Sequence, residues 1–487
     1  MNSVRQNTIK GVFWNGVEKF ANQGIRFLVG LVLARILSPS DFGTVAVLGI
    51  FFSISNAFVD SGFGTALIRK NNRIEVDFTT VFIFNIAVSL FFYGLLFIIA
   101  PWVAAFFKQP ILTSILRVQS LCVVFGGFMA VLDAKLTIDL NFKVIAQRSV
   151  TSSIISGCVG IILAYLGFGV WALVFQAITL SFVNMVFVWI YCKWKPRLIF
   201  SLTSFKELFA FGSKLLTAAM LNTVYRSLTP LAIGRVYTTS DLGFYNRGSE
   251  FARLPNEVCL NVLEKVTFPI FAKLQDDQNH LINVYRKYIK ITSMFLIFFS
   301  LLLAALAKPV ILLLLTEKWT DSIVYLQLFC FAVMFNHINT INLSLLKVNG
   351  RSDLFLKLEV IKKVVATLIL FAAIPFGVLA ICISKIIYDQ VAIIINTYYS
   401  GKLFGMGYIS QIKDFIGYFF LSILACLPSY LISMTGLHFL LQITLGVFLS
   451  VIIYYFLIRK DVIFIELRRT IEPQISVVVA KFKNKFF

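Results

Sequence analysis

The sequence predicts an all-α integral membrane protein with about fourteen transmembrane helices, and three observations lead to this prediction. Of the 487 residues, 59% are hydrophobic and only 14% are charged, whereas a soluble domain carries roughly a quarter charged residues. Many apolar runs are long enough to cross a bilayer, which takes about 20 largely apolar residues. The sequence also repeats itself at an offset of about 200 residues, which predicts two parallel copies of one six-helix unit and two additional C-terminal helices.

The apolar runs follow one another with short connections, so no separate soluble domain fits between them. We expect transmembrane helices near 11–34, 43–66, 79–100, 111–132, 149–167, 169–192, 209–233, 243–270, 288–307, 323–346, 358–376, 377–399, 411–434 and 437–458.

Basic residues in the connections predict how these helices are oriented. If the N-terminus is cytoplasmic, the odd-numbered connections face outward, and their only basic residues are Arg35, Lys108, Arg235, Lys308 and Lys318. The even-numbered connections are richer in Lys and Arg, beginning with Arg69, Lys70 and Arg73. Because cytoplasmic loops carry an excess of Lys and Arg, we expect both termini to be cytoplasmic.

Several other classes of function are disfavoured by the composition. The net charge of +21 is explained by these cytoplasmic loops, so we expect no nucleic-acid partner. All seven cysteines stand alone in apolar segments without a CxxC pair, as small hydrophobic residues of a membrane core do. None of the three histidines has a metal ligand at helical spacing, and we expect no metal and no organic cofactor. The polar start at 1–10 predicts that no cleaved signal peptide is present.

The internal repeat is carried by polar residues. Asn22-Gln-Gly-Ile-Arg26 recurs as Asn222-Thr-Val-Tyr-Arg226, and the turn from Arg35 to Gly43 recurs from Arg235 to Gly243. Further on, Phe168-Gly-Val-Trp-Ala172 matches Phe376-Gly-Val-Leu-Ala380. Six helices is an even number, so both copies insert with the same orientation.

Four regions follow from the repeat. We expect an N-terminal lobe over 1–200, a C-terminal lobe over 201–400, two additional helices over 401–458 and a basic cytoplasmic tail over 459–487. Transporters built from such repeats hold their substrate between the lobes and alternate access by rocking.

Charged side chains inside the predicted helices are the candidates for function, since each costs roughly 2.5–3.5 kcal/mol at mid-bilayer. Asn22 and Arg26 are four residues apart and share a helix face, as do Asn222 and Arg226. Two guanidiniums could hold a phosphate in bidentate fashion. The alternative is that each Arg satisfies backbone carbonyls, pairs with an acid or reaches an interface. Duplication of the pattern favours an anion site.

The run 243–270 is the most charged, with Arg247, Glu250, Arg253, Glu257 and Glu264. Arg247–Glu250 and Arg253–Glu257 fit intrahelical ion pairs, so we favour a structural network here. Pro255 would kink the helix and make a gate.

Four carboxylates are candidates for coupling transport to a proton or sodium gradient: Asp60, Glu18, Glu257 and Glu264. Asp60 precedes Ser61-Gly-Phe-Gly64 near the cytoplasmic end of its helix, so a cap or loop contact is an equal alternative. The duplicated turns at 35–43 and 235–243 are interpreted as structural, with Ser40 and Asp41 as N-caps of the next helix.

Three motifs carry a resemblance to a known family: Ala34-Arg-Ile-Leu-Ser-Pro-Ser-Asp-Phe-Gly43, Asp60-Ser-Gly-Phe-Gly-Thr-Ala-Leu-Ile-Arg69 and Gly169-Val-Trp-Ala-Leu-Val174. They resemble the Wzx-type polysaccharide flippases of the multidrug/oligosaccharidyl-lipid/polysaccharide superfamily, in the branch for colanic-acid-like and teichuronic-acid-like polymers. The likeness covers essentially the whole chain. One departure is Thr316-Glu-Lys-Trp319, where relatives often have Gly-x-x-Trp, and this puts a local turn in doubt.

The resemblance implies two V-shaped lobes around a cationic cavity, in the inner membrane of a bacterium. It implies a substrate consisting of an oligosaccharide repeat unit on undecaprenyl pyrophosphate, for O-antigen, capsule or exopolysaccharide. The cavity arginines would be Arg26 and Arg226, with Arg247 and Arg253 as secondary candidates. Partners would be the polymerase and glycosyltransferases of the pathway. The alternatives are a peptidoglycan-precursor flippase, a small-molecule exporter, whose cavity would instead need carboxylates, and a membrane polymerase or ligase, which would need a large outward loop.

Overall fold

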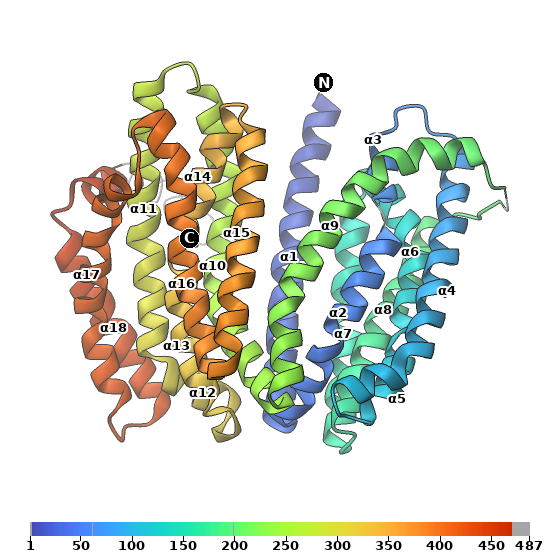
Figure 1. Cartoon of the computed structure of the whole chain (residues 1–487), viewed down its shortest axis with the longest axis horizontal. Helices are drawn as coiled ribbons and strands as arrows, with labels where there is room; N and C mark the ends of the chain where they lie inside the picture. The colour runs from blue at the N-terminus through green and yellow to red at the C-terminus, as the bar shows by residue number, and fades with distance from the viewer. Residues whose placement is uncertain (1, 61, 198, 470–487) are drawn as a thin grey trace, which may run out of the picture. The chain divides into compact units, whose positions relative to one another are not determined.

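The computed structural model describes residues 2–60, 62–197 and 199–469, apart from the side chains of 2–10, 12, 13, 258, 261, 262, 264–266 and 352. The described chain is helical throughout and contains no strand (Figure 1). It divides into two compact units, Met1–Gly243 and Phe244–Phe487. The first unit contains α1 (Asn2–Ile36), α2 (Pro39–Asp60), α3 (Phe63–Arg69), α4 (Glu75–Phe106), α5 (Ile111–Gln119), α6 (Leu121–Ile138), α7 (Phe142–Tyr165), α8 (Val170–Cys192) and α9 (Leu202–Val236).

The helix α10 (Thr239–Lys273) begins in the first unit and continues into the second. The second unit then contains α11 (Gln278–Ala305), α12 (Ala307–Leu315), η1 (Glu317–Trp319), α13 (Ser322–Val333), α14 (Asn336–Val348), α15 (Ser352–Ala373), η2 (Ile374–Phe376), α16 (Val378–Phe404), α17 (Tyr408–Ser433) and α18 (Phe439–Ile458). The lobes expected from the repeat meet at residue 200, yet α9 packs on α2, α3 and α4 of the first unit.

Ten segments of the described chain are long and apolar enough to cross a membrane, which makes this a multi-pass membrane protein. They are Pro39–Arg69, Glu75–Phe106, Ile111–Ile138, Phe142–Tyr165, Val170–Cys192, Gln278–Ala305, Ser322–Val348, Val378–Phe404, Tyr408–Ser433 and Phe439–Ile458. The other four expected spans correspond to α1, α9, α10 and α15, whose internal charges lower their hydropathy. The number fourteen therefore remains a prediction.

Three of the expected spans are interrupted rather than continuous. The left-handed Gly62, with φ of 69°, separates α2 from α3. The run 111–138 is split into α5 and α6 at Ser120, and the run 322–348 into α13 and α14 at Met334 and Phe335. Hydropathy could not show these breaks, because the residues at them are as apolar as their neighbours or nearly so.

The two duplicated turns contain the same reciprocal cap. In the first, Ser38 Oγ donates to Asp41 Oδ2 (2.6 Å), and the Asp41 N–H donates back to Ser38 Oγ (3.3 Å). In the second, Thr238 and Asp241 make the same two bonds at 2.7 and 3.1 Å. The turns are therefore structural, as predicted, but the N-cap is Ser38 rather than Ser40 or Asp41. The reason is that Pro39 occupies the first helical position and Asp41 the third, as in a capping box.

Two glycines hold these turns against each other. A Cβ on Gly43 would lie 1.8 Å from the carbonyl oxygen of Thr239, and a Cβ on Gly243 would lie 2.0 Å from that of Pro39. Any side chain at either position would displace the facing backbone. The contact is reciprocal, because Gly43 faces Thr239 and Gly243 faces Pro39. Residues 39 and 43 correspond to residues 239 and 243 in the sequence repeat. We call this contact the glycine crossing.

The turn at Thr316 forms despite its departure from the family pattern. Thr316 has φ of 84° and ψ of 174°, a conformation that only glycine adopts readily. The 3₁₀ turn η1 follows it and places Trp319 fully inside the second unit.

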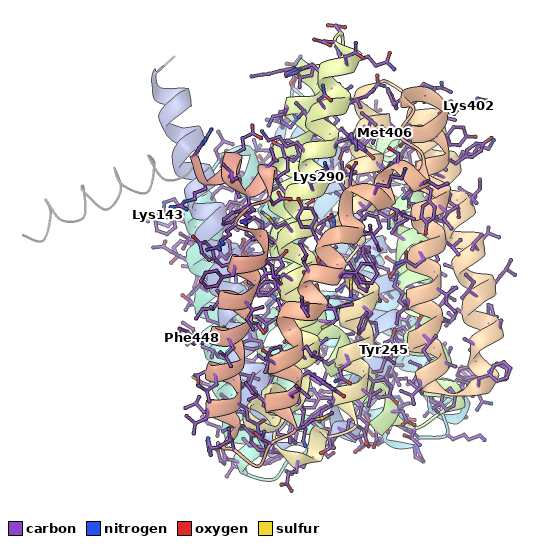
Figure 2. All side chains as sticks on the ribbon, turned by 90° about the vertical axis from the view of Figure 1, so that its left-hand side faces the viewer. Lys143, Tyr245, Lys290, Lys402, Met406 and Phe448 are labelled. Atoms are coloured by element: carbon purple, nitrogen blue, oxygen red, sulfur yellow. The ribbon has the colours of Figure 1, made fainter. Side chains whose placement is uncertain are left out.

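The additional helices α17 and α18 pack on α11. Tyr454 stacks on Phe298 with ring centroids 4.2 Å apart, and its hydroxyl donates to the carbonyl of Met294 (2.6 Å). At one end of α11, Arg286 donates to both oxygens of the buried Asp414 at 2.7 and 2.9 Å. Figure 2 shows that Lys402 and Met406 lie at one end of the second unit, with Tyr245 and Phe448 in its other half.

Candidate functional site

Polar side chains of α1 and α7 form a hydrogen-bonded cluster inside the first unit. The Asn22 amide nitrogen donates to Glu18 Oε1 (3.1 Å) and Ser149 Oγ (2.7 Å), and the Asn22 oxygen accepts from Ser153 Oγ (2.7 Å). Ser149 Oγ also donates to Glu18 Oε1 (3.2 Å). Asn22 is buried and both of its amide hydrogens are used. Its position therefore suits holding the Glu18 carboxylate in place against α7.

The two arginines of the repeated Asn-x-x-x-Arg pattern are exposed. Arg26 on α1 is exposed although Asn22, one turn earlier, is buried, so this pair does not share one environment. Asn222 and Arg226 on α9 are both exposed. Exposed guanidiniums inside membrane helices need water or an anionic partner.

Arg226 lines a cavity of about 200 Å³ between α2 and α9. Ser53 of α2 and Ser227 lie in the same wall, with Pro230 one turn further along. Proline has no N–H, so Pro230 cannot bond the Arg226 carbonyl as the next helical turn otherwise would. Figure 1 shows that α9 is bent along its length. The cavity therefore presents a guanidinium, hydroxyls and a helix carbonyl that lacks its usual donor.

A second charged cluster lies where α2, α6 and α7 meet. Arg148, which is buried, donates to Asp133 at 2.5 Å, and its Nε is buried with no partner among the described residues. Asp60 at the end of α2 is within electrostatic range of Asp133. Sequence reasoning singled out Asp60 as a candidate, but neither Arg148 nor Asp133. Their fifteen-residue separation spans two helices, so no local pattern reveals the pair.

The connection after α3 is tied to α4 and α9 by one lysine. Lys70 Nζ lies 3.0 Å from Asp77 and 2.9 Å from Glu207. Burial lowers the pKa of Lys70, but the hydrogen bonds to Glu207 and Asp77 outweigh it and raise this pKa above its ordinary value. Beside it is a cavity of about 440 Å³ lined by Arg69, Asn71 and Phe211 among others.

In the second unit, the predicted pair of Arg247 and Glu250 is confirmed at 2.6 Å. Arg247 is buried and its guanidinium lies 5.8 Å from the Trp319 ring centre, which favours a structural role. The other predicted pair is wrong: Arg253 and Glu257 are exposed and form no ion pair among the described side chains. Pro255 between them interrupts the regular helix hydrogen bonding on which such spacing depends. The side chain of Glu264 lies outside those that the structure describes.

Charges on α15 and α16 were missed by sequence reasoning. Lys385 and Asp389 form an ion pair at 2.8 Å within α16, and Lys362 pairs with Glu359 at 2.5 Å within α15. The signal was present, since each pair interrupts an apolar run. It was passed over because the search followed the repeat, and these charges have no counterpart in the first copy.

The described residues contain no group of three His, Cys, Asp or Glu side chains that could hold a metal ion. The polar groups that the structure brings together are therefore guanidiniums, ammoniums and carboxylates in apolar surroundings. Such groups can bind and release anions and protons across a membrane.

The chain is similar to known proteins of polysaccharide biosynthesis. Residues 32–324 match the model of a family described as "Polysaccharide biosynthesis protein". The succinoglycan biosynthesis transport protein ExoT of Rhizobium meliloti (strain 1021) is 28% identical over 320 residues, which are 65% of this chain and 64% of that protein, just under two thirds of its length. The lipopolysaccharide biosynthesis protein WzxC of Escherichia coli (strain K12) is 25% identical over 366 residues, 74% of each chain.

Among solved structures, the lipid II flippase MurJ in its inward closed conformation aligns with a TM-score of 0.73 at 15% identity. The alignment covers 92% of this chain and 99% of that one. At this identity the likeness shows the fold alone, and it confirms the all-helical membrane architecture.

Proposed function

Since this chain belongs to the polysaccharide biosynthesis protein family, as the resemblance of its motifs implied, we propose that it is a lipid-linked oligosaccharide flippase. It would move an oligosaccharide repeat unit on undecaprenyl pyrophosphate from the inner to the outer leaflet of the bacterial cytoplasmic membrane. The single observation that carries this proposal is the pair of exposed arginines, Arg26 and Arg226, inside long helices of a membrane transporter fold.

The proposed architecture is fourteen spans in two parallel six-helix repeats, with α17 and α18 added. Two observations support the repeats: the matching capping boxes at Ser38 and Thr238, and the glycine crossing. The four helices that are too polar to count as spans by hydropathy, α1, α9, α10 and α15, carry charges that need water or a partner inside a membrane. The basic connections support cytoplasmic N- and C-termini.

The proposed anion site uses Arg26 and Arg226 as primary ligands and Asn222 as a further one, and Arg253 stays a secondary candidate. Guanidiniums suit a pyrophosphate because two parallel N–H donors match two phosphate oxygens. Asn22 and Arg247 were also predicted here, but both already have partners within their own unit, which favours positioning roles. The oligosaccharide would occupy water while the polyprenyl chain stays in lipid.

Coupling to a proton or sodium gradient would use a carboxylate. Glu18 is the strongest candidate, because Asn22 and Ser149 hold one of its oxygens in place. Asp60 is a second candidate through its proximity to Asp133. Glu257 is exposed on α10 and stays a prediction, as does Glu264.

Two other functions of the same fold remain to be distinguished by substrate. The MurJ fold supports a peptidoglycan-precursor flippase as the second candidate. A small-molecule exporter would require carboxylates in its binding cavity, whereas Arg226 lines a cavity beside the repeated motif in the first unit. Glycosyltransferases and a polymerase of one polysaccharide pathway are the proposed partners. The relative ExoT is named a transport protein, so a polymerase or ligase activity is not proposed for this chain.

The test is transport by the purified protein in vesicles. A fluorescent undecaprenyl-pyrophosphate oligosaccharide should become accessible in the opposite leaflet without a change in mass. The double variant Arg26→Gln/Arg226→Gln should lose at least about tenfold of this rate, because each lost charge-assisted contact contributes about 1.5–3 kcal/mol. Arg351→Gln, which lies in an exposed connection, is the matched control and should transport normally. Wild-type transport by the double variant would overturn the proposed site.

A further inference from the structure

A cavity of about 620 Å³ lies in the second unit, where α15, α16 and the start of α17 meet. Its polar side chains are one lysine, three tyrosines and Thr397, whose hydroxyl already donates to the carbonyl of Ile393 (2.8 Å). The rest of the lining is mostly aliphatic. A water molecule takes up about 30 Å³, so a cavity of this size suits a molecule rather than a single ion.

The polar and the aliphatic residues lie at two levels of the cavity. The helices α15 and α16 are joined by the short turn η2 and pack against each other (Figure 1). Lys357 lies five residues after the first residue of α15, and Tyr398 lies six residues before the last residue of α16. Both are therefore about 8–9 Å from the same end of the helix pair. Ile361 and Ile394, which also line the cavity, lie one turn deeper.

The level of Lys357 and Tyr398 matches the boundary between lipid headgroups and hydrocarbon. The 27 residues of α16 extend about 40 Å, whereas the hydrocarbon core of a bilayer is about 30 Å thick. About 5 Å at each end of α16 therefore lies among headgroups, and the two residues lie just below. Tyrosine is enriched at this depth because its ring is apolar and its hydroxyl is polar. A ligand that reaches both levels has a polar head and an apolar chain.

Lys357 differs from the basic residues on either side of it. Arg351 lies 2.9 Å from Asp353, and Lys362 lies 2.5 Å from Glu359. Lys357 is exposed and forms no ion pair among the described side chains. Its ammonium is therefore open to an anionic group that the protein itself does not provide.

Three phenol hydroxyls line the same cavity, and none makes a hydrogen bond within the described part of the chain. They belong to Tyr398, Tyr399 and Tyr408. An ammonium offers only donors, and a phenol hydroxyl can donate as well. The complement to this set is a negatively charged group rich in oxygen acceptors, such as a phosphodiester. A phosphodiester joined to an acyl chain is the chemistry of a glycerophospholipid.

A lysine and tyrosines that merely reach the membrane interface explain the level of these residues but not the cavity. Side chains that extend to the interface need no gap between helices. An empty gap would lose dispersion contacts along its wall, so lipid from the bilayer fills it. Among the described residues of the lining, the charged one is a cation, and basic pockets between transmembrane helices favour anionic headgroups.

We propose that this cavity binds one anionic glycerophospholipid of the surrounding bilayer, with phosphatidylglycerol as the headgroup that fits. Its phosphodiester lies at Lys357 and the tyrosine hydroxyls, and one acyl chain lies against Ile361 and Ile394. Arg351 and Lys402 lie in connections at the same end, which is predicted to be cytoplasmic, so the lipid belongs to the inner leaflet. Figure 2 shows Lys402 at one end of the second unit. This resident lipid is separate from whatever the chain transports.

Native mass spectrometry of the full-length protein in detergent tests the proposal. The protein is titrated separately with phosphatidylglycerol and with phosphatidylcholine of the same acyl chains. The wild type should bind one phosphatidylglycerol about tenfold more tightly than phosphatidylcholine. Lys357→Gln should bind phosphatidylglycerol about tenfold more weakly and phosphatidylcholine as before, because one charge-assisted contact is lost. Lys357→Arg should keep the preference.

Two further variants separate a built site from general attraction. Lys308→Gln is the matched control: Lys308 is an exposed lysine at the start of α12 in the same unit, a helix that contributes no residue to this cavity, so binding should not change. Ile394→Trp fills the deeper level and should weaken both lipids about tenfold. The Ile394 side chain is 48% exposed, which leaves room for the larger ring, and this variant keeps Lys357 intact.

Four results would overturn the inference. Equal affinity of the wild type for the two lipids would show an apolar gap that any lipid fills. An equal loss in Lys357→Gln and Lys308→Gln would show attraction by overall charge. Wild-type binding by Ile394→Trp would place the acyl chain elsewhere. Displacement of phosphatidylglycerol by equimolar farnesyl pyrophosphate would assign the cavity to a polyprenyl substrate. None of these results bears on transport through Arg26 and Arg226, so the proposed function stands or falls separately.

Discussion

At the scale of single residues, Thr316 is held in a backbone conformation that suits glycine. Its φ of 84° and ψ of 174° cost about 1–3 kcal/mol for a residue with a side chain. We expect Thr316→Gly to raise the free energy of unfolding by about 1 kcal/mol, after the entropy that glycine adds to the unfolded chain. The melting temperature of the purified protein in detergent measures this.

Thr320 is the matched control for this change. It lies in the same turn with φ of −53°, where glycine relieves no strain, and its hydroxyl donates to the Glu317 carbonyl. Thr320→Gly should therefore lower the melting temperature. A loss of stability in both variants would show that Thr316 is not strained.

At this scale, the sequence showed which polar and charged residues lie inside apolar helices, but not which side chains they contact. Arg26 and Arg226 stood out because both are charged and recur in the repeat. The partners of Asn22 are Ser149 and Ser153, more than a hundred positions away, and serine is common in membrane helices for many reasons. The bond from Arg148 to Asp133 joins α7 to α6, so helical spacing did not reveal it either. Pairing across helices depends on packing, which hydropathy does not encode.

At the scale of helices, one carboxylate fastens the additional helix α17 to α11. Asp414 is buried, accepts two bonds from Arg286 and lies 3.5 Å from Lys290. Asp414→Asn should lower the free energy of unfolding by about 1–2 kcal/mol, because the charge-assisted bonds are lost while both cations keep partial access to solvent. Thermal unfolding monitored by size-exclusion chromatography measures this loss.

The control for Asp414 is Glu466→Gln, since the ion pair of Glu466 with Lys287 also joins α11 to the C-terminal segment but is more exposed. This variant should be close to the wild type. An equal loss in both variants would mean that burial of Asp414 does not strengthen its contacts.

At the scale of helices, the sequence predicted where the helices lie but not where a predicted span is broken into two helices. All ten apolar segments of the structure coincide with predicted runs, since burial in lipid demands long apolar stretches. The breaks at Ser120 and at Met334–Phe335 leave composition almost unchanged, so no hydropathy signal marks them. The turns at 38–41 and 238–241 were recognised by their Ser/Thr and Asp residues, but the N-cap was misplaced because the role of Pro39 as first helical residue was not weighed.

At the scale of the whole molecule, the basic connections predict which loops face the cytoplasm. A cysteine at Lys318, in an outward connection, should react with a membrane-impermeant maleimide on intact cells. A cysteine at Arg351 should react only after permeabilisation, because its connection is predicted to be cytoplasmic. Mass-shift labelling on gels measures both, in a background where the native cysteines are replaced. Equal labelling of the two sites on intact cells would contradict the proposed orientation.

Family and membrane class were both within reach of the sequence, because turn motifs and long apolar runs leave strong local signals. The division into compact units was not. The repeat places a boundary at 200, yet α9 packs with the first unit, since contacts follow the surfaces that helices bury rather than their order in a duplication. The boundary at 200 describes the repeat in the sequence, whereas the compact units describe which helices pack together.

The glycine crossing has a meaning in terms of symmetry. In a homodimer with a two-fold axis, residue i of one subunit touches residue j of the other, and j in turn touches i. Gly43 meets Thr239 and Gly243 meets Pro39, which is this isologous pattern within a single chain. The sequence repeat predicts such a pattern if its two copies are related by a two-fold axis. A side chain at either glycine would then disturb one of two matching halves of a single contact.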